Sequence, residues 1–222
     1  MKIHTNEFKT AIAELGRELT ATITYGQTTL TGDNELYKVT PHFEANLLKS
    51  VMKQLDLECT VDIPKETVIN CQIGIKVNNS FEMLDFGNYV VYSSEKQEDT
   101  GMYKIICYDK MLYAMKQNED LEITYPITIA NYLTVLATKI GLTVANETFY
   151  NSSLEIPQEL YLGTEYTYRD ILDEIAQATG SMIIINNNDE IELIYPLNTN
   201  DTIDEDYLKD TNVTFGEKYR TN

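Results

Sequence analysis

Residues 69–77 read INCQIGIKV, and every second residue of this stretch is apolar: Ile69, Cys71, Ile73, Ile75 and Val77. Because successive side chains of a β-strand point to opposite faces of a sheet, this alternation places the apolar side chains together on one face. Polar or small residues occupy the other face. The stretch therefore predicts a strand that packs inward on one side and meets solvent on the other.

Further strands are predicted on both sides of this stretch. Residues 20–30 (TATITYGQTTL) carry β-branched residues on either side of a glycine, which is typical of a short hairpin. Residues 88–92 (NYVVY) and 102–108 (MYKIICY) have the same apolar character, and the acidic segment 95–101 (EKQEDTG) separates them as a turn. We therefore expect residues 20–112 to form an antiparallel, β-barrel-like sheet.

Two segments of this first part have the apolar spacing of amphipathic helices. Residues 8–19 predict an N-terminal helix, because their apolar residues recur every three or four positions. Residues 43–55 have a similar spacing, whereas residues 57–63 alternate like a strand. A second helix is therefore expected before that strand, with its end near Leu55.

Two later segments share one helix design. Residues 128–142 carry apolar side chains on one face, with Thr128 suited to the N-cap and Gly141 to the left-handed position after the helix. The same pattern recurs in residues 167–181, from Thr167 to Gly180. The recurrence fits an internal duplication and equally fits two similar capped helices of independent origin.

The second helix leads directly into a predicted hairpin. Residues 182–185 and 191–195 are rich in apolar residues, and NNND at 186–189 supplies the turn between them. The fold class expected for the chain is α+β: an antiparallel barrel-like domain with an N-terminal helix, then an α+β segment with two helices and a β-hairpin.

Composition and charge restrict the classes of partner. The chain has 222 residues, 17 Lys and Arg against 35 Asp and Glu, and a formal charge of −18. Such a surface repels polyphosphates, so sequence-specific nucleic-acid binding is not expected. The acidity either serves solubility or forms a surface along which DNA or acidic protein slides without sticking.

Cysteine content and hydropathy indicate the compartment. Three cysteines without metal-ligand spacing predict buried free thiols in a reducing environment. The first eight residues lack the apolar core of a signal peptide, and no stretch approaches the roughly 20 apolar residues of a membrane span. The three thiols belong to Cys59, Cys71 and Cys107. We expect the protein to be synthesised in a cytoplasm.

No motif for catalysis, cofactor binding or metal binding is present in the sequence. There is no GxSxG, P-loop, GxGxxG or HExxH, and the two histidines fit surface positions better than the role of a catalytic base. No catalytic, cofactor-binding or metal-binding residue is assigned, and the chain is expected not to be an enzyme. The rejected candidates are His4 and His42 as bases, and the pairs Glu155–Glu159 and Asp204–Asp206 as glycosidase carboxylates. A calcium loop at Asp201, Asp204, Glu205 and Asp206 is kept as a minor alternative, although it lacks the EF-hand pattern.

Residues 83–111 (MLDFGNYVVYSSEKQEDTGMYKIICYDKM) resemble tail-tip or baseplate hub proteins of phages that infect Gram-positive bacteria. That family includes the N-terminal hub part of tail-associated lysins and of prophage tail endopeptidases. The resemblance continues in order through 125–128 (YPIT), 167–170 (TYRD) and 215–219 (FGEKY). Each motif is weak alone, and their order supplies the specificity.

The resemblance implies a structural role. Hub proteins of this family have two barrels with α+β segments between them and form homotrimers, and the trimer adapts a six-fold tail to a three-fold tip. The ring leaves a channel for the tape-measure protein and DNA, and it contacts the distal tail protein and tail-tip or receptor-binding proteins. The implied location is the tail of the virion, assembled in the host cytoplasm, without a membrane-spanning segment or a cofactor.

The resemblance also divides the chain. Residues 1–118 would be the first barrel, 119–197 the α+β segment, and 198–222 an acidic loop with the start of a second barrel near Asn212. Most of that second barrel would be lacking, as in the front part of a longer protein. Two other functions are considered: a LysM-like cell-wall binding module over residues 127–195, and part of a peptidoglycan-degrading tail lysin.

Overall fold

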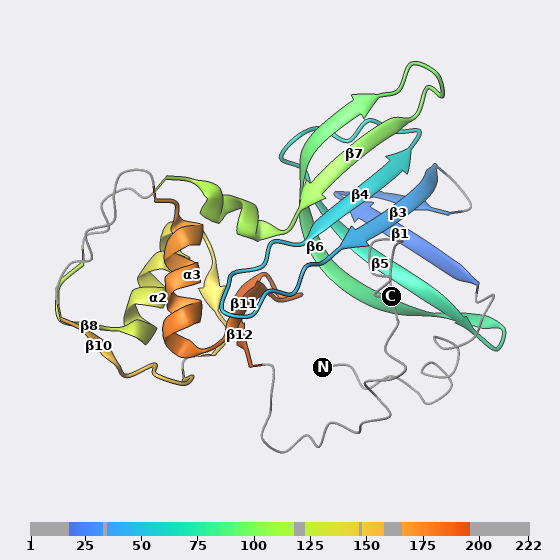
Figure 1. Ribbon diagram of the computed structural model, residues 1–222. Helices are drawn as coiled ribbons and strands as arrows, with labels where there is room; N and C mark the ends of the chain where they lie inside the picture. The colour runs from blue at the N-terminus through green and yellow to red at the C-terminus, as the bar shows by residue number, and fades with distance from the viewer. Residues whose placement is uncertain (1–17, 33–34, 118–122, 147, 158–165, 196–222) are drawn as a thin grey trace, which may run out of the picture. The chain divides into compact units, whose positions relative to one another are not determined.

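The computed structural model describes residues 18–32, 35–117, 123–146, 148–157 and 166–195 (Figure 1). The chain divides into two compact units, each described by itself. The first contains the residues up to Thr40 together with Gln54–Tyr108, and the second contains Pro41–Lys53 and the residues from Asp109 onward. The predicted N-terminal helix 8–19 lies almost entirely outside the described residues, as does the predicted start of a second barrel.

The first unit is built around a seven-stranded sheet in the order β2-β1-β5-β6-β7-β4-β3. The pairings of β5 with β1 and β6, and of β7 with β6 and β4, are all antiparallel. The strands are β1 Leu19–Tyr25, β2 Thr28–Thr31, β3 Leu36–His42, β4 Gln54–Cys59, β5 Val68–Val77, β6 Ser80–Lys96 and β7 Tyr103–Tyr108.

The alternation predicted for residues 69–77 is confirmed in β5, which lies inside the sheet. Ile69, Cys71 and Ile75 are at most 1% exposed, and Ile73 is also buried. Ile69, Cys71 and Ile73 join one apolar core with residues of other strands of the sheet, including Ile23, Leu57 and Ile105. The hydrophobic pattern of a single strand thus identified the buried face of the whole sheet.

Both predicted hairpins of this unit are confirmed. The first turns at Gly26, whose φ of 54° lies in the left-handed region, and Tyr25 pairs with Thr28 across the turn. A two-residue turn between strands favours this backbone conformation, which glycine adopts without strain. The acidic segment forms the turn between β6 and β7, where Gln97 and Met102 share a backbone hydrogen bond of 2.8 Å.

Two expectations for this part of the chain need correction. Within the described residues the sheet is open, with β2 and β3 at its two edges, rather than a closed barrel. The helix predicted for residues 43–55 is also wrong: residues 43–53 form an irregular segment with a turn at Leu47 and Leu48, and Leu55 lies in β4. The helical spacing was misleading because backbone hydrogen bonds to residues far along the chain fix this segment. The N–H groups of Leu48 and Val51 donate to the carbonyls of Ser181 and Ile183, and the Ile183 N–H donates to the Lys49 carbonyl.

Gly74 occupies the tightest position in the first sheet. A Cβ atom placed there would lie 2.5 Å from Sδ of Met83 and 2.7 Å from Cγ2 of Thr20, its partners on the two flanking strands. The methionine can move, but the short threonine side chain on β1 has little freedom to give way. Only a residue without a side chain therefore fits between these two neighbours.

We expect Gly74→Ala to destabilise the first unit by about 1–3 kcal/mol, the usual cost of overpacking. Urea unfolding followed by circular dichroism measures the effect. Gly32→Ala is the matched control, because a Cβ there meets only Thr20 Oγ1 at 3.9 Å. Equal stability of the two variants would contradict the prediction.

The second unit packs two helices with a small sheet. Its elements are the 3₁₀ helix η1 Lys110–Met115, β8 Ile127–Thr128, α2 Ile129–Lys139, β9 Thr143–Val144, β10 Glu155–Ile156, α3 Tyr168–Thr179, β11 Met182–Ile185 and β12 Glu190–Ile194. The sheet order is β11-β12-β9, with β9 parallel to β12. Apolar faces of both helices and of this sheet form one core, which includes Leu133, Leu136, Leu172, Ile183 and Ile191.

The predicted helix ends and hairpin of this unit are confirmed. Thr128 caps α2 by accepting from the backbone N–H of Asn131, and Thr167 caps α3 in a reciprocal pair with Asp170. Gly141 and Gly180 have φ values of 77° and 67° just after their helices. Local chemistry decided these ends, because a cap involves only residues next to it in the chain. The hairpin β11–β12 turns at residues 186–189 as expected.

Candidate functional site

Few of the residues considered as chemical candidates fall within the described part of the chain. His42 ends β3, and Glu155 lies exposed at the start of β10. His4, Glu159, Asp201, Asp204, Glu205 and Asp206 lie outside the described residues.

The three cysteines are free and buried, as predicted. All three belong to the core of the first unit. Burial is the largest cause that raises the pKa of each thiol, and the pKa of Cys71 reaches about 12. Protonated, inaccessible thiols are poor nucleophiles and poor metal ligands, so these side chains serve as core residues.

In the described ranges, no group of three or more His, Cys, Asp and Glu side chains is placed to hold a metal ion. The same ranges contain no helix that is long and apolar enough to cross a membrane.

A polar cluster in the second unit, which we call the α3 clamp, consists of Lys49, Ser50, Arg169 and Asp173. Ser50 is 2% exposed and donates from both its backbone N–H and its hydroxyl to Oδ1 of Asp173, at 2.7 and 2.5 Å. Arg169 donates to the Ser50 carbonyl at 3.2 Å, and Lys49 pairs with Oδ2 of Asp173 at 3.5 Å. The clamp ties the segment 48–51 to the half-buried side chains Arg169 and Asp173 of α3.

The α3 clamp contains a serine hydroxyl and a carboxylate but no described histidine. A nucleophilic serine needs a base that accepts its proton and a third group that orients the base. Here the hydroxyl of Ser50 donates its proton to Asp173, and Nε of Arg169 donates to the hydroxyl oxygen at 3.4 Å. The geometry therefore fits structural support better than acyl transfer.

Asp109 is a buried carboxylate at the start of the second unit. It is 0% exposed, and its Oδ1 caps η1 by accepting from the backbone N–H of Met111 at 3.2 Å. Among the described residues no group donates to its Oδ2. Burial raises the pKa of Asp109 to about 6, and the charges of Lys53 and Arg169 offset only part of that rise.

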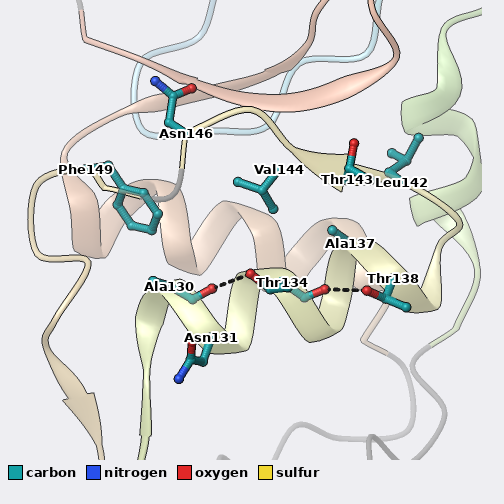
Figure 2. A pocket seen from close by; sticks show the side chains of 10 residues that line it. All are labelled: Ala130, Asn131, Thr134, Ala137, Thr138, Leu142, Thr143, Val144, Asn146 and Phe149. Carbon is teal, nitrogen blue, oxygen red and sulfur yellow. Dashed lines mark hydrogen bonds between the residues drawn. The ribbon is translucent and has the colours of Figure 1, made fainter.

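An open groove of about 550 Å³ lies beside α2 in the second unit (Figure 2). Its lining comes from α2, from β9 and the loop that follows it, and includes Thr134, Thr138, Val144, Asn146 and Phe149. The volume falls in the usual range for small-molecule sites.

Sequence reasoning identified neither the α3 clamp nor Asp109 nor the groove. Ser50 and Asp173 are 123 positions apart, and no local periodicity connects them. The one available signal for Asp109 was its position immediately after an apolar strand, which fits an N-cap but does not indicate burial. Only the folded chain brings these groups together.

No protein-family model and no curated protein matches the chain. Solved structures do match. The 43 kDa tail protein of prophage MuSo2 from Shewanella oneidensis is similar over 82% of this chain and 57% of its own, with a TM-score of 0.54 and 12% identity. The tail protein from Neisseria meningitidis MC58 is similar over 79% of this chain and 50% of its own, with a TM-score of 0.53 and 12% identity.

A third similar structure is the Francisella PdpA–VgrG complex in a half-lidded state. It matches over 96% of this chain and 36% of its own chain, with a TM-score of 0.54 and 10% identity. This chain thus spans between about a third and somewhat more than half of the structures that it matches. Identities of 10–12% speak for the fold alone, and the chain therefore has an α+β fold similar to that of phage tail proteins.

Proposed function

We propose that this chain is a structural component of a phage tail and acts as a hub protein at the tail tip. The observation that carries the proposal is the breadth of the structural match, which spans 79–82% of the chain in two tail proteins. Such a match includes parts of both units rather than one common motif. The match to the PdpA–VgrG complex supports partners among other tail-like proteins.

In the finer form of the proposal, three copies close into a ring that adapts the six-fold tail to a three-fold tip. The ring leaves a channel for the tape-measure protein and DNA, and it contacts the distal tail protein and tail-tip or receptor-binding proteins. Three further predictions belong to this proposal: the domain boundaries lie at residues 118 and 197, the phage infects Gram-positive bacteria, and the tail assembles in the host cytoplasm. The open edges β2 and β3 leave room for contacts between copies.

Mass in solution tests this proposal. Light scattering after size-exclusion chromatography should give about 76 kDa for the chain alone, three times the 25.4 kDa of one chain. If the trimer forms only with the distal tail protein of the same phage, the mass of the complex should correspond to three copies of this chain plus the bound partner. Negative-stain images of that species should show a ring with an opening. A strict monomer that never associates with the distal tail protein would overturn the hub.

The proposal also includes an acidic channel. A chain with a formal charge of −18 can line a lumen with carboxylates, which keep DNA from adhering during passage. A cryo-electron microscopy map of the assembled ring would locate these side chains. A basic or apolar lumen would contradict this part of the proposal and leave the ring itself intact.

The lysin alternative predicts turnover of cell-wall polymer. We expect no release of soluble fragments when the chain is incubated with purified peptidoglycan, because no catalytic constellation was found in the sequence or among the described contacts. Measurable turnover would favour a lysin over a structural hub.

A further inference from the structure

The outer face of the first sheet carries a pair of tyrosines. Tyr92 of β6 and Tyr108 of β7 meet in a T-shaped contact, with ring centroids 5.4 Å apart. Tyr108 lies opposite Val90, and Val90 lies opposite Val68 of β5, so these three side chains share one face of the sheet. This face is the outer one, because Ile69, the residue after Val68, belongs to the core. We call Val68, Val90, Tyr92 and Tyr108 the tyrosine patch; their strands β5, β6 and β7 run side by side in Figure 1.

The tyrosine patch keeps apolar surface in contact with solvent. Tyr92 is 55% exposed and Val68 is 45% exposed, whereas Val90 is 2% exposed. The register of β6 with β7 shifts at Tyr92, which marks a β-bulge there. A bulge interrupts the ladder and re-aims the side chain that it carries. A local irregularity of the backbone therefore presents the Tyr92 ring beside Tyr108.

Two rows of polar side chains continue the outer face beyond the tyrosine patch. The pairings across β2, β1, β5 and β6 align Thr29, Thr24, Asn70 and Asn88 in the first row, and Thr31, Thr22, Gln72 and Asp85 in the second. The first row lies two residues along β5 from Val68, a step of roughly 7 Å. Asp85 is the only charged side chain in the two rows. We call the tyrosine patch and these two rows together the low-charge area.

Charged side chains bound the low-charge area on the other side of the tyrosine patch. Glu95, Lys104 and Glu58 lie opposite one another on β6, β7 and β4. Lys38 of β3 pairs with Glu58 at 3.6 Å. An ionic ligand would find opposite charges at this ladder and not in the low-charge area. The low-charge area is thus a limited and distinct part of a chain with a formal charge of −18.

Asn70 shows which hydrogen-bonding groups the low-charge area offers. Its Nδ2 donates to Oδ1 of Asp85 at 3.1 Å and to Oδ1 of Asn88 at 3.2 Å, which uses both amide hydrogens. Among the described residues no group donates to Oδ1 of Asn70 or to the hydroxyls of Thr22 and Thr24. The area therefore offers acceptors and hydroxyls to a ligand that brings its own donors.

These properties together select a neutral saccharide among the classes of ligand. Sugar hydroxyls donate as well as accept, and the C–H face of a sugar ring can pack against an aromatic ring. A proline-rich peptide offers carbonyl acceptors but few N–H donors, so it does not match an area rich in acceptors. The carboxylate of Asp85 already accepts from Asn70 and from the backbone N–H of Gly87, and its charge disfavours anionic polymers.

We propose that the low-charge area on the outer face of β1, β5 and β6 binds a segment of a neutral polysaccharide. The ring of Tyr92 packs against one sugar ring, Oδ1 of Asn70 accepts from a sugar hydroxyl, and the hydroxyl of Thr24 forms a hydrogen bond with another. The inference goes beyond the hub proposal and does not depend on it, because all of these residues belong to one sheet of one chain.

Titration of ²H,¹⁵N-labelled protein with cellohexaose and with chitohexaose tests the site. We expect amide shifts confined to β1, β5, β6 and β7 for at least one of the two sugars, without dependence on salt. Tyr92→Ala removes the ring and should weaken binding about tenfold, whereas Tyr92→Phe keeps the ring and should bind within about twofold of the parent. Thr24→Val removes one hydroxyl at nearly constant shape and should weaken binding roughly three- to tenfold.

Tyr150→Ala is the matched control, because Tyr150 is a tyrosine of the second unit with 69% exposure. It should leave the affinity unchanged, and melting curves should show that all variants are folded. The proposal is overturned if neither sugar shifts these resonances, or if Tyr92→Ala binds as the parent does. It is also overturned if the shifts arise only with decaproline, or only with polygalacturonate and vanish in salt.

A contact between copies is a separate outcome of the same variants. If Tyr92→Ala changes the mass in solution and leaves the sugar affinity unchanged, the tyrosine patch joins two copies and the saccharide proposal is wrong. The mass of the parent protein is measured separately, so failure here and failure of the hub are distinguishable.

Discussion

Replacing Asp109 by asparagine is expected to stabilise the second unit at neutral pH and to leave its stability nearly unchanged near pH 4. Asparagine keeps the oxygen that accepts from Met111 N–H and removes the buried charge. The pKa of Asp109 rises from 3.8 to about 6 on folding, which corresponds to about 3 kcal/mol at about 1.4 kcal/mol per unit. Part of this gain is lost, because the new amide N–H₂ takes the place of an oxygen without a hydrogen-bond partner among the described residues.

The sign follows from proton linkage. The pKa of this carboxyl is raised on folding. Between about pH 4 and pH 6 the folded state therefore keeps a proton on Asp109, whereas the unfolded state has released it. The free energy of unfolding therefore falls as the pH rises from about 4 to about 6 and stays low above that range. The Asp109→Asn variant should lack this decline.

Hydrogen exchange in urea, read on peptides of the second unit between pH 4 and 8, measures both effects. Asp170→Asn is the control with the opposite sign. Hydrogen bonds from Thr167 lower the pKa of the exposed Asp170, so its contribution is present at neutral pH and is lost on acidification. If Asp109→Asn destabilised the unit at pH 7 as Asp170→Asn does, the buried charge would not be the cause of the decline.

Replacing Asp173 by alanine should destabilise the second unit by about 2–4 kcal/mol. The change leaves the N–H and the hydroxyl of Ser50 without their acceptor, and each buried donor without a partner costs about 1–3 kcal/mol. It also leaves Lys49 without the carboxylate with which it pairs. The segment 48–51 should then protect its amides less well from exchange.

Two variants of α3 sharpen this test. Asp173→Asn keeps an acceptor for Ser50 and should cost clearly less than Asp173→Ala. Glu174→Ala changes the next residue, which is exposed, and should have an effect within about 0.5 kcal/mol. A double-mutant cycle with Ser50→Ala should give a coupling energy different from zero. Equal effects of Asp173→Ala and Glu174→Ala would mean that the clamp contributes nothing.

Most elements of the fold could be predicted because their signals are local. The alternation of Ile69, Cys71 and Ile73 indicated a buried strand face, and Thr167 with Gly180 indicated both ends of α3. The helix expected for residues 43–55 shows the limit of such signals. Six apolar residues matched the helical period, yet Phe43, Leu47 and Leu48 are exposed in a segment that is not helical.

The candidate sites could not be predicted in the same way. The thiols were expected to be buried, but the α3 clamp, the charge of Asp109 in the interior and the groove beside α2 were not foreseen. Each depends on segments that meet only after folding: residues 48–51 with α3 and β11, or α2 with β9 and Phe149. A single sequence carries no record of such pairs.

The sequence by itself determined the α+β class, the strands around β5, the three hairpins and the caps of α2 and α3, because periodicity and capping act between residues a few positions apart. Tertiary structure alone decided that the sheet stays open at β2 and β3, and that residues 48–51 leave their helical pattern to run beside β11. The physical reason is that a backbone hydrogen bond or a buried carboxylate is satisfied by whichever group lies nearest in space. That group can be 123 positions away, as Asp173 is from Ser50.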